Sequence, residues 1–510
     1  MSRKVSIVAV LVVVGMSLSG CQLFGNFGQA PVEPVRATAD DFYAQTVSWS
    51  GCGDYDGMQC AKIAAPTDWD APADGEIELA IVKSPATGTA QGSVLVNPGG
   101  PGGSGWSFVY GQGPSTVSAA VSESFDIIGW DPRGVGQSTP VTCYSEPAET
   151  DEVLYGTFEA EYDSQAWIDE LTQVEQAFAA ACGANTGALL GNLDAASNAK
   201  DMDMIRALVG DDKLNYLGYS YGTFFGTVYA ELFPQNVGRL VLDGAIDPLL
   251  SSVESLTVQM AGFDSAFRAY MEYCLGAAGS CPFSGSVDEA LGQARTVLEG
   301  VDARGLVGDD GRELDSATLG TAIALNLYSE SYWPDMSMMF EQLEADDPAL
   351  VFENADYYNS RNPDGSYDGN SFEVYTAASC ADGDFTEDSA STLDRVAEID
   401  AAAPILGKFF AYDDYAVLDV ACTNWPVAPG DLPASFSAVG AAPILVIGTT
   451  NDPATPYAWA QSLASQLSSG VMISYTGEGH TIYNQGVACI DDLVGEYFVN
   501  GTVPSVDPMC

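Results

Sequence analysis

Short apolar runs, separated by amphipathic or glycine-rich stretches, recur in the first half of this 510-residue chain and again near its end. The run from Ile77 to Val82 alternates, which is typical of a half-buried strand. Other runs are mostly apolar and predict further strands. These runs are Ser93–Val96, Phe125–Trp130, Leu214–Gly218, Arg239–Gly244, Ala442–Gly448 and Val471–Tyr475.

Helical periodicity lies between these runs, as at Asn192–Gly210, and dominates from about Ile246 to Leu432. Strands that alternate with helices imply an α/β fold with a mostly parallel sheet covered on both faces. We predict a core built from residues 41–245 and 433–510, with a mainly helical lid at 246–432. The longest helical patterns in the lid are Val253–Cys274, Ser286–Gly300 and Ser316–Leu343.

The stretch Gly218-Tyr219-Ser220-Tyr221-Gly222 joins a predicted strand to a helix-like pattern. G-x-S-x-G in this context is typical of a nucleophile elbow, whose sharp turn leaves no room for side chains at the two glycines. Such a turn exposes the Ser220 hydroxyl and directs the next N–H, that of Tyr221, at the same point. Because glycine and serine are common in loops, the motif alone is weak and needs support elsewhere in the chain.

A serine nucleophile needs a base, and the base needs an acid that orients it. The chain has a single histidine, His480, in a loop after the last predicted strand. Asp452 follows the preceding strand, and the order Ser, Asp, His is that of the α/β-hydrolases. We therefore predict an α/β-hydrolase fold with Ser220, Asp452 and His480 as its triad. Asp243, at the end of an earlier strand, is the alternative acid.

The loop Asn97–Gly105 is rich in glycine and follows a predicted buried strand. It could be a flexible surface loop, but its place upstream of the elbow favours a loop whose backbone closely approaches the site. We predict that an N–H near Gly100 forms the oxyanion hole together with that of Tyr221. Asp131 and Arg133, after the next strand, are interpreted as structural.

The N-terminus predicts export. Ser2-Arg3-Lys4 is basic, and the apolar run that follows is too short to span a bilayer comfortably. Leu18-Ser19-Gly20-Cys21 resembles a bacterial lipobox, although an ordinary signal peptide could also contain a cysteine. We predict a signal peptide at 1–20, lipidation of Cys21 and a flexible tether at 21–40. The protein would then lie at the outer face of the cytoplasmic membrane, or be secreted.

Cysteine usage agrees with export. Eleven cysteines less Cys21 leave ten, which suggests five disulfides. Sequence does not determine their connectivity, but the spacing favours near neighbours. These pairs are Cys52–Cys60, Cys143–Cys182, Cys274–Cys281, Cys380–Cys422 and Cys489–Cys510. No C-x-x-C or cysteine–histidine cluster suggests a metal, and no cofactor is predicted.

The charge narrows the choice of partners. With 70 acidic and 17 basic residues, the net charge is −53. Such a surface repels nucleic acid and anionic lipid, so neither is expected as a partner. Contact with the membrane is expected only through the lipid anchor. The simplest interpretation of the negative charge is that it keeps the protein soluble.

From Trp49 to the C-terminus, the motifs resemble those of the secreted tripeptidyl aminopeptidases of actinobacteria, relatives of proline iminopeptidase. The most specific match is the Asn97–Gly105 loop, and Pro98 stands where proline iminopeptidases have histidine. Cys380-Ala381-Asp382 and Cys422–Pro426 resemble the paired lid cysteines of this family. The other matches are Trp49–Gly53, Cys60-Ala61, Asp131–Ser138, Gly218–Gly222, Arg239–Gly244, Asp452–Pro456 and Gly479-His480.

The resemblance implies a serine exopeptidase that removes short peptides, above all tripeptides, from a free N-terminus through an acyl-enzyme. Binding of the substrate ammonium would need an acidic group, for which Glu330, Asp382 and Asp384 are candidates in the lid. A carboxylesterase acting on small acyl esters would use the same triad and is the main alternative. A non-enzymatic lipoprotein is disfavoured because the triad and elbow are intact.

Overall fold

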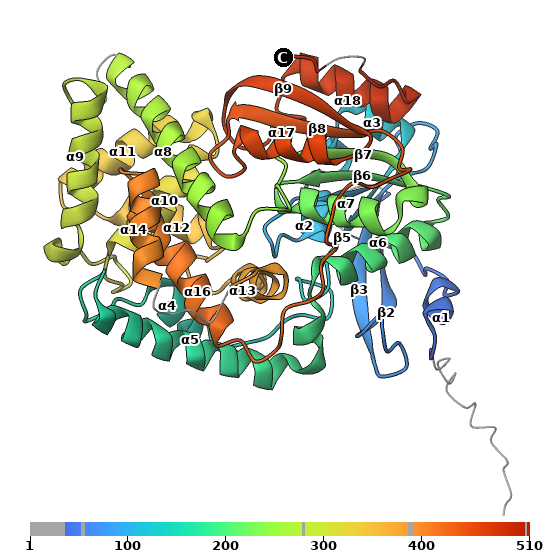
Figure 1. Cartoon of the computed structure of the whole chain (residues 1–510), viewed down its shortest axis with the longest axis horizontal. Coiled ribbons are helices and arrows are strands. Elements are labelled where there is room, and N and C mark those ends of the chain that lie inside the picture. Colours follow the sequence, from blue (N-terminus) through green and yellow to red (C-terminus); the bar gives the residue numbers. More distant parts are fainter. Residues whose placement is uncertain (1–35, 53–56, 278–280, 386–391, 505–506) are drawn as a thin grey trace, which may run out of the picture. The chain divides into compact units, whose positions relative to one another are not determined.

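Nine strands form one sheet in the computed structural model, which describes residues 36–52, 57–277, 281–385, 392–504 and 507–510. Figure 1 shows the sheet on one side and a group of helices, α8 to α12, α14 and α16, on the other. All of these elements belong to the unit Ala37–Cys510. The predicted signal peptide and Cys21 lie outside the described residues.

The strand order is β1-β2-β3-β5-β4-β6-β7-β8-β9. The pairs β1–β2, β2–β3 and β3–β5 are antiparallel, and every other neighbouring pair is parallel. The prediction of a mostly parallel sheet is therefore confirmed. The strands are β1 (Ser50–Gly51), β2 (Gln59–Pro66), β3 (Glu76–Ser84), β4 (Ser93–Asn97), β5 (Asp126–Trp130), β6 (Leu214–Tyr219), β7 (Val237–Asp243), β8 (Ile444–Asn451) and β9 (Gly470–Glu478).

All the predicted strands are present, as β3 to β9. The strand β2 was not predicted, and its composition gives the reason. It contains Ala61, Ala64 and Ala65 and a lysine, Lys62, and both residue types are depleted in strands. Pairing with β3 along its full length, rather than intrinsic preference, holds β2 in the sheet.

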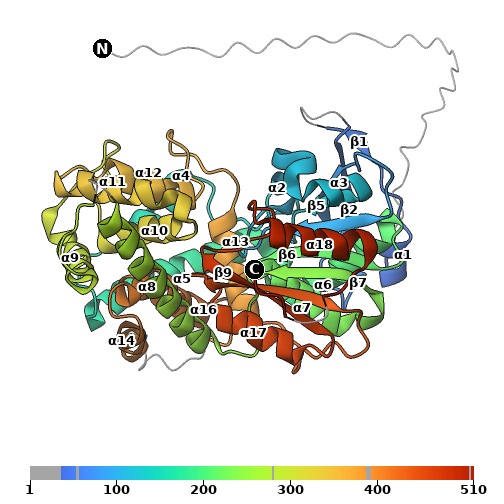
Figure 2. The same ribbon diagram turned by 90° about the horizontal axis from the view of Figure 1, so that it is seen from above.

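Both faces of the parallel strands are buried. On β7, Leu240 and Leu242 belong to one hydrophobic cluster and Val241 to another. The first cluster packs against α6 (Ala195–Val209), α7 (Tyr221–Leu232) and α17 (Tyr457–Gln466), and the second against α2 (Gly105–Gln112), α3 (Ala119–Ser124) and α18 (Ala488–Asn500). Figure 2 shows these two helical layers on opposite faces of the sheet. Apolar runs without polar alternation are what such double burial requires.

The segment from Ser252 to Thr423 contributes helices and no strand to the sheet in its described part. The predicted helix 316–343 is two helices, because the chain turns at Tyr328–Tyr332 and Pro334 lies in the first turn of the second helix. The helices are α8 (Ser252–Gly276), α9 (Val287–Gly300), α10 (Ser316–Leu327), α11 (Trp333–Glu344), α12 (Ala349–Tyr358), α13 (Ser371–Asp382), α14 (Thr392–Ala402), α15 (Gly407–Phe410), η7 (Ala411–Tyr415) and α16 (Ala416–Thr423).

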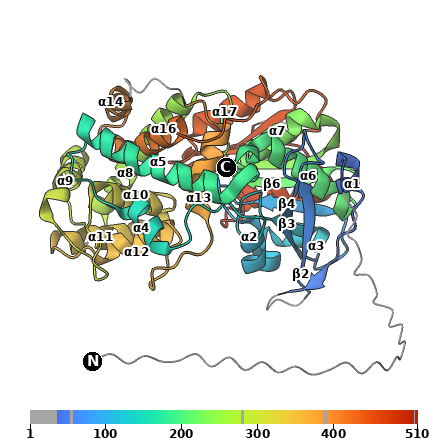
Figure 3. The same ribbon diagram turned by 90° about the horizontal axis from the view of Figure 1, so that it is seen from below.

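The lid has its own hydrophobic cluster, and the cluster extends the predicted lid. Trp167 and Ile168 of α5 (Gln165–Thr186) belong to it, together with residues of α8, α10 and α16, whereas Phe178 of α5 belongs to the core. Figure 3 shows α5 passing from the lid helices to the core. The sequence analysis included this helix and α4 (Pro147–Tyr155) in the first part of the core. Their packing shows that an earlier segment also builds the lid.

The five predicted disulfide pairs are all present. They join residues between 7 and 42 positions apart, so each closes a local loop. Disulfides of this number are typical of exported proteins. Among the described helices, none combines the length and apolar character needed to cross a membrane.

Candidate active site

Ser220 occupies the sharp turn predicted between β6 and α7. Its φ of 51° and ψ of −124° are unusual for a residue with a side chain. A Cβ at Gly218 would lie 2.5 Å from the carbonyl oxygen of Gly222, and one at Gly222 would lie 2.7 Å from Oδ1 of Asn97. The Ser220 N–H donates to the carbonyl oxygen of Asp243 at 2.9 Å. Sterics therefore explain both glycines, and the neighbouring strand anchors the turn.

Asp452 and His480 meet above β8 and β9. Nδ1 of His480 lies 2.9 Å from both carboxylate oxygens of Asp452. The backbone N–H groups of Ala454 and Thr455 donate to Oδ1 of Asp452 at 2.9 and 2.8 Å. The backbone therefore orients this carboxylate independently of its contact with the imidazole. The side chain of His480 is 7% exposed and that of Asp452 is 0% exposed.

The surroundings of His480 favour its charged form. Burial lowers the pKa of His480, but the charge of Asp452 and its hydrogen bond raise it more, so the net pKa is raised. The hydroxyl of Thr455 lies 3.2 Å from Nδ1 of His480 and 3.0 Å from Oδ2 of Asp452. Thr455 was not predicted from the sequence. Its position three residues after Asp452 could have indicated a hydroxyl close to that carboxylate.

The carboxylate of Asp243, the alternative acid, holds the backbone that follows His480. Its Oδ2 accepts hydrogen bonds from the N–H groups of Ile482 and Tyr483 at 2.9 and 2.7 Å. Burial raises its pKa to about 6, although these two hydrogen bonds lower it. Asp243 thus fixes the chain just after His480, while Asp452 makes the direct contact with the imidazole.

The glycine-rich loop after β4 lies against the elbow. A Cβ at Gly99 would lie 2.6 Å from the carbonyl oxygen of Tyr219 and 3.1 Å from the nitrogen of Tyr221. The Gly99 N–H is used within the loop, donating to Oδ1 of Asn97 at 2.8 Å. Tyr221 begins α7, and the first N–H groups of a helix lack intrahelical acceptors. The predicted oxyanion donors, Gly100 and Tyr221, therefore belong to backbone segments in contact, and their catalytic role stays a prediction.

Asp131 and Arg133 have the structural roles that were predicted. The carboxylate of Asp131 accepts hydrogen bonds from the Ser104 hydroxyl and from the Trp106 and Gln137 N–H groups. It thereby connects its own loop to the end of the glycine-rich loop. Nε and Nη2 of Arg133 lie 2.8 and 2.9 Å from the two carboxylate oxygens of Asp201.

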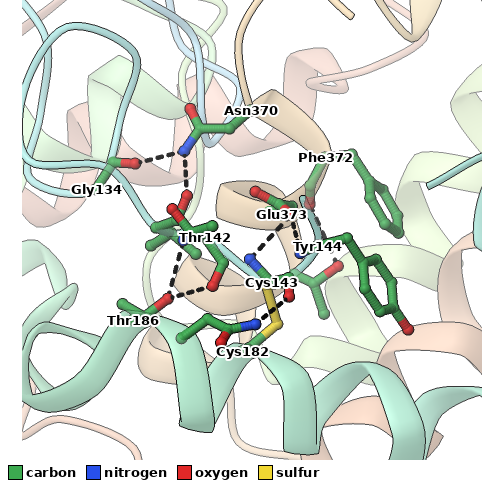
Figure 4. The surroundings of a disulfide bond; sticks show 12 residues. Gly134, Thr142, Cys143, Tyr144, Cys182, Thr186, Asn370, Phe372 and Glu373 are labelled. Atoms are coloured by element: carbon green, nitrogen blue, oxygen red, sulfur yellow. Dashed lines mark hydrogen bonds between the residues drawn. A yellow bond between two sulfur atoms is a disulfide. The ribbon is translucent and has the colours of Figure 1, made fainter. Parts of the chain in front are cut away.

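One end of the lid is fastened to the core beside the Cys143–Cys182 disulfide. Figure 4 shows the Glu373 carboxylate of α13 facing the backbone there, where it accepts hydrogen bonds from the Cys143 and Tyr144 N–H groups, both at 3.0 Å. Asn370 donates to the carbonyl oxygen of Gly134 at 2.9 Å (Figure 4). Helix α13 is therefore held at a fixed place relative to the sheet.

A second lid segment contacts the loop that carries His480. The His480 N–H donates to the carbonyl oxygen of Tyr328 at 2.9 Å. The two rings also meet edge to face, with centroids 5.1 Å apart. Tyr328 follows directly after α10, as its C-terminal capping residue, so the lid helps to position the imidazole.

Two cavities, of about 840 and 280 Å³, adjoin Ser220. His480 lines only the larger cavity, and Tyr221 lines only the smaller one. Core and lid residues form a wall that the two cavities share. These residues are Gly100, Pro101, Ser220, Tyr328, Tyr358, Tyr375 and Asp414.

The three candidate acids of the lid have different surroundings. Asp382 lines the smaller cavity and accepts hydrogen bonds from the Tyr221 hydroxyl and, at 2.8 Å, from the Ala195 N–H. Burial raises its pKa to about 7, although these bonds lower it. Asp384 is exposed and accepts a hydrogen bond from Ser252, and Glu330 is exposed and lines neither cavity.

Asp414 also lines both cavities, and it was not predicted from the sequence. In so acidic a chain, nothing in its local sequence distinguishes it from a surface aspartate. Within the described residues, no group of three or more histidine, cysteine, aspartate or glutamate side chains is placed to hold a metal ion.

Comparisons with known proteins agree with this fold. The family model described as "alpha/beta hydrolase fold" matches residues 92–281, and the one described as "TAP-like protein" matches residues 408–510. The chain is 34% identical to the serine protease Hip1 of Mycobacterium tuberculosis, over 100% of this chain and 98% of that protein. It is also 34% identical to carboxylesterase B of the same species, over 97% and 94% of the two chains. Identity to the tripeptidyl aminopeptidase of Streptomyces lividans is 28%, over 89% and 83%.

Proposed function

The chain belongs to the α/β-hydrolases, among the serine hydrolases related to tripeptidyl aminopeptidases, and from this premise we propose that it is a serine exopeptidase. It would release short peptides, in the first place tripeptides, from the free N-terminus of peptide substrates. Its partners would then be short peptides.

In the proposed acyl transfer, Ser220 is the nucleophile, His480 is the base and Asp452 orients the imidazole. Ser220 Oγ attacks the scissile carbonyl carbon while His480 takes its proton at Nε2, because Nδ1 faces Asp452. The N–H groups of Gly100 and Tyr221 would stabilise the oxyanion. His480 then protonates the leaving amine, and water hydrolyses the acyl-enzyme to regenerate Ser220.

The two cavities suggest an orientation for the substrate. Since His480 gives its proton to the leaving amine, the leaving peptide should extend into the larger cavity, which His480 lines. The acyl part, which is the N-terminal peptide to be released, would then occupy the smaller cavity beside Tyr221. The larger volume on the leaving side suits substrates of varied length.

The observation that carries the proposal is the charge of the cavity walls. Besides His480, the charged side chains that line them are Asp247, Asp382 and Asp414, and no lysine or arginine is among the described lining residues. A partly desolvated carboxylate is costly without a cation. The ammonium of a free N-terminus would provide that cation, whereas a neutral acyl ester would not.

A carboxylesterase that acts on small acyl esters is the second candidate, and it would use the same triad. The 34% identity to carboxylesterase B favours it. A free substrate amine is irrelevant to this reaction, so the two functions differ in a property that can be measured.

A chromogenic panel on protein that lacks residues 1–21 tests the proposal. It contains a free-amine tripeptide anilide, its N-acetylated twin, a single-residue anilide and a short-chain nitrophenyl ester, with Ser220→Ala as the control. We expect cleavage of the free tripeptide and little cleavage of its blocked twin. Cleavage of the ester alone would instead identify an esterase.

We also propose that Cys21 carries a lipid anchor that holds the enzyme at the outer face of the cytoplasmic membrane. The lipobox-like sequence and the disulfides, which need an oxidising compartment, support export. Growth with a radiolabelled fatty acid should label the wild type and leave Cys21→Ala unlabelled. An unlabelled wild type would mean that the protein is secreted without an anchor.

A further inference from the structure

Asp414 lies in an unusual piece of backbone. The π-helical turn η7, Ala411–Tyr415, interrupts what would otherwise be a continuous helix from α15 to α16. Single π turns inside α-helices are rare and frequently occur at functional sites, because they change the direction of a side chain. This turn carries Asp414 in the wall that both cavities share with Ser220.

The carboxylate of Asp414 has few partners of its own. In the part of the chain that the structure describes, its hydrogen bond comes from the Tyr375 hydroxyl at 3.4 Å, and no salt bridge involves it. A contact of that length is weak. Burial raises the pKa of Asp414 to about 6, and the hydrogen bond from Tyr375 only partly offsets this. At neutral pH the group is therefore mostly a carboxylate without a counter-charge.

The other two carboxylates of the smaller cavity are better satisfied. Asp247 accepts hydrogen bonds from the Leu249 N–H at 3.1 Å and from Nε2 of Gln466 at 2.7 Å. Asp382 accepts hydrogen bonds from Tyr221 and from the backbone of Ala195. The fold supplies hydrogen bonds to both, and Asp382, whose pKa burial raises to about 7, is only partly charged at neutral pH. Asp414, whose pKa is about 6, is mostly charged and has one weak hydrogen bond among the described residues, so it is the one that gains most from a ligand cation.

Tyrosine side chains complete the surroundings of Asp414. Tyr328, Tyr358 and Tyr375 line both cavities with it. The rings of Tyr328 and Tyr358 meet edge to face, with centroids 6.2 Å apart. A primary ammonium has three N–H donors and is attracted to aromatic faces, so a carboxylate among tyrosines suits it well.

We propose that Asp414 binds the α-ammonium of the substrate and thereby makes the enzyme selective for free N-termini. This inference rests on the proposed function, and it names the residue that would enforce the exopeptidase specificity. Asp414 would make its ion pair from the wall beside Ser220, while Tyr328 contacts both this site and His480. Binding of the N-terminus would in this way be linked to placement of the scissile bond.

The test measures two quantities in each variant. The first is kcat/KM for the free tripeptide anilide and for the nitrophenyl ester. The second is the inhibition constant of a free-amine tripeptide, and of its N-acetylated twin, against ester hydrolysis. Because inhibition needs no peptide cleavage, it reports on ammonium binding even if the enzyme proves to be an esterase.

In Asp414→Asn we expect kcat/KM for the free tripeptide to fall about 100-fold, as when one partner of a desolvated ion pair is lost. The inhibition constant of the free tripeptide should rise by a similar factor, while that of the acetylated twin and the ester kcat/KM should change little. Asp288→Asn, which removes an exposed carboxylate of the lid that lines neither cavity, should leave all four values near those of the wild type.

Other outcomes distinguish a failure of the proposed exopeptidase function from a failure of the role proposed for Asp414. If the wild type cleaves only the free tripeptide and Asp414→Asn does so equally well, the proposed function stands and the role of Asp414 is wrong. If Asp382→Asn rather than Asp414→Asn removes the preference for a free amine, Asp382 is the anchor. Loss of ester hydrolysis in Asp414→Asn would indicate misfolding, and the smaller Asp414→Ser would then replace it, with retained free-amine preference counting against the inference.

Discussion

Carboxylates of the sheet core and of the cavity wall are held in different ways. In the core, Asp201 forms a two-point ion pair with Arg133 and accepts a further hydrogen bond from Nε1 of Trp69 at 2.9 Å. In the lid, Asp414 accepts one hydrogen bond from the described residues, that of the Tyr375 hydroxyl at 3.4 Å. A carboxylate whose acceptor sites are filled belongs to the scaffold, whereas one that faces a cavity with an acceptor to spare can receive a ligand.

The contrast teaches that burial alone does not identify a binding residue. Asp201, Asp243 and Asp452 are all buried, and each is held by hydrogen bonds that orient the chain or the imidazole. Oδ1 of Asp243 also lacks a hydrogen-bond partner among the described residues, but Asp243 lines neither cavity. Asp414 differs because its acceptor to spare lies in the cavity wall beside Ser220. Substitutions at Ser220, His480, Asp452, Asp243 and Arg133 test the roles assigned to the core residues. Substitution of Asp414 tests whether this lid carboxylate binds a ligand instead of holding the fold.

The largest effect is expected at the triad. Ser220→Ala and His480→Ala should each lower kcat by about 10⁶-fold, by analogy with other serine peptidases, because the nucleophile or its base is lost. The melting temperature should stay nearly unchanged, since neither side chain holds the sheet together. Stopped assays with the nitrophenyl ester and thermal unfolding measure the two quantities, and substantial activity in His480→Ala would refute the triad.

The choice of acid gives the next largest effect. Asp452→Asn should reduce kcat about 10⁴-fold, because the amide no longer favours the required imidazole tautomer. Asp243→Asn should chiefly lower the free energy of unfolding, since its carboxylate holds the Ile482 and Tyr483 N–H groups. Steady-state kinetics and urea unfolding on both variants distinguish these results. The opposite pattern would make Asp243 the acid.

Arg133→Ala should have a large effect on stability and little effect on chemistry. Both side chains of the Arg133–Asp201 pair are 0% exposed. Loss of one partner leaves a buried charge, which typically costs about 3–5 kcal/mol of unfolding free energy. Urea unfolding measures this change, and active-site titration shows whether the folded fraction retains its kcat.

An exposed ion pair supplies the control for Arg133. Lys62 and Glu78 lie 3.1 Å apart, with side chains 51% and 62% exposed. Lys62→Ala should shift the unfolding midpoint much less, because solvent already screens that pair. Equal shifts of the unfolding midpoint in Arg133→Ala and Lys62→Ala would mean that the buried ion pair contributes no more to stability than the exposed one.

The smallest expected effect is in the pH dependence. Asp414 becomes neutral as the pH falls through about 6. His480, whose pKa is raised above its ordinary value, also becomes protonated on acidification and then no longer acts as a base. Both changes lower kcat/KM for a free tripeptide, whereas only the second lowers it for an ester. The ratio of the two kcat/KM values should therefore decline below about pH 6 in the wild type.

In Asp414→Asn the same ratio should be flat over this range, because no carboxylate remains to titrate at that point. Parallel pH profiles of the two substrates report it directly. A ratio that declines equally in the wild type and in the variant would assign the titration to another group, such as Asp382, whose pKa is about 7.

Much of this molecule can be predicted from local sequence. Strands β3 to β9 are recognisable because burial on both faces demands continuous apolar runs. The elbow is recognisable because Gly218 and Gly222 are sterically required beside Ser220. The proximity of Ser220, Asp452 and His480 could be expected because each follows a strand of a parallel sheet, whose carboxyl ends share one edge. Cysteine spacing identified the five disulfides, since all join segments close in sequence.

Tertiary structure alone decided the rest. Whether Asp452 or Asp243 contacts His480 depends on the path of two loops, and sequence left both open. Helix α5 joins the lid because one half of it packs against residues far along the chain. Asp414 reaches the wall beside Ser220 only through a π turn and the packing of α12 and α13 around it. In a chain with 70 acidic residues, only long-range contacts can distinguish the carboxylate that meets the substrate from those that meet water.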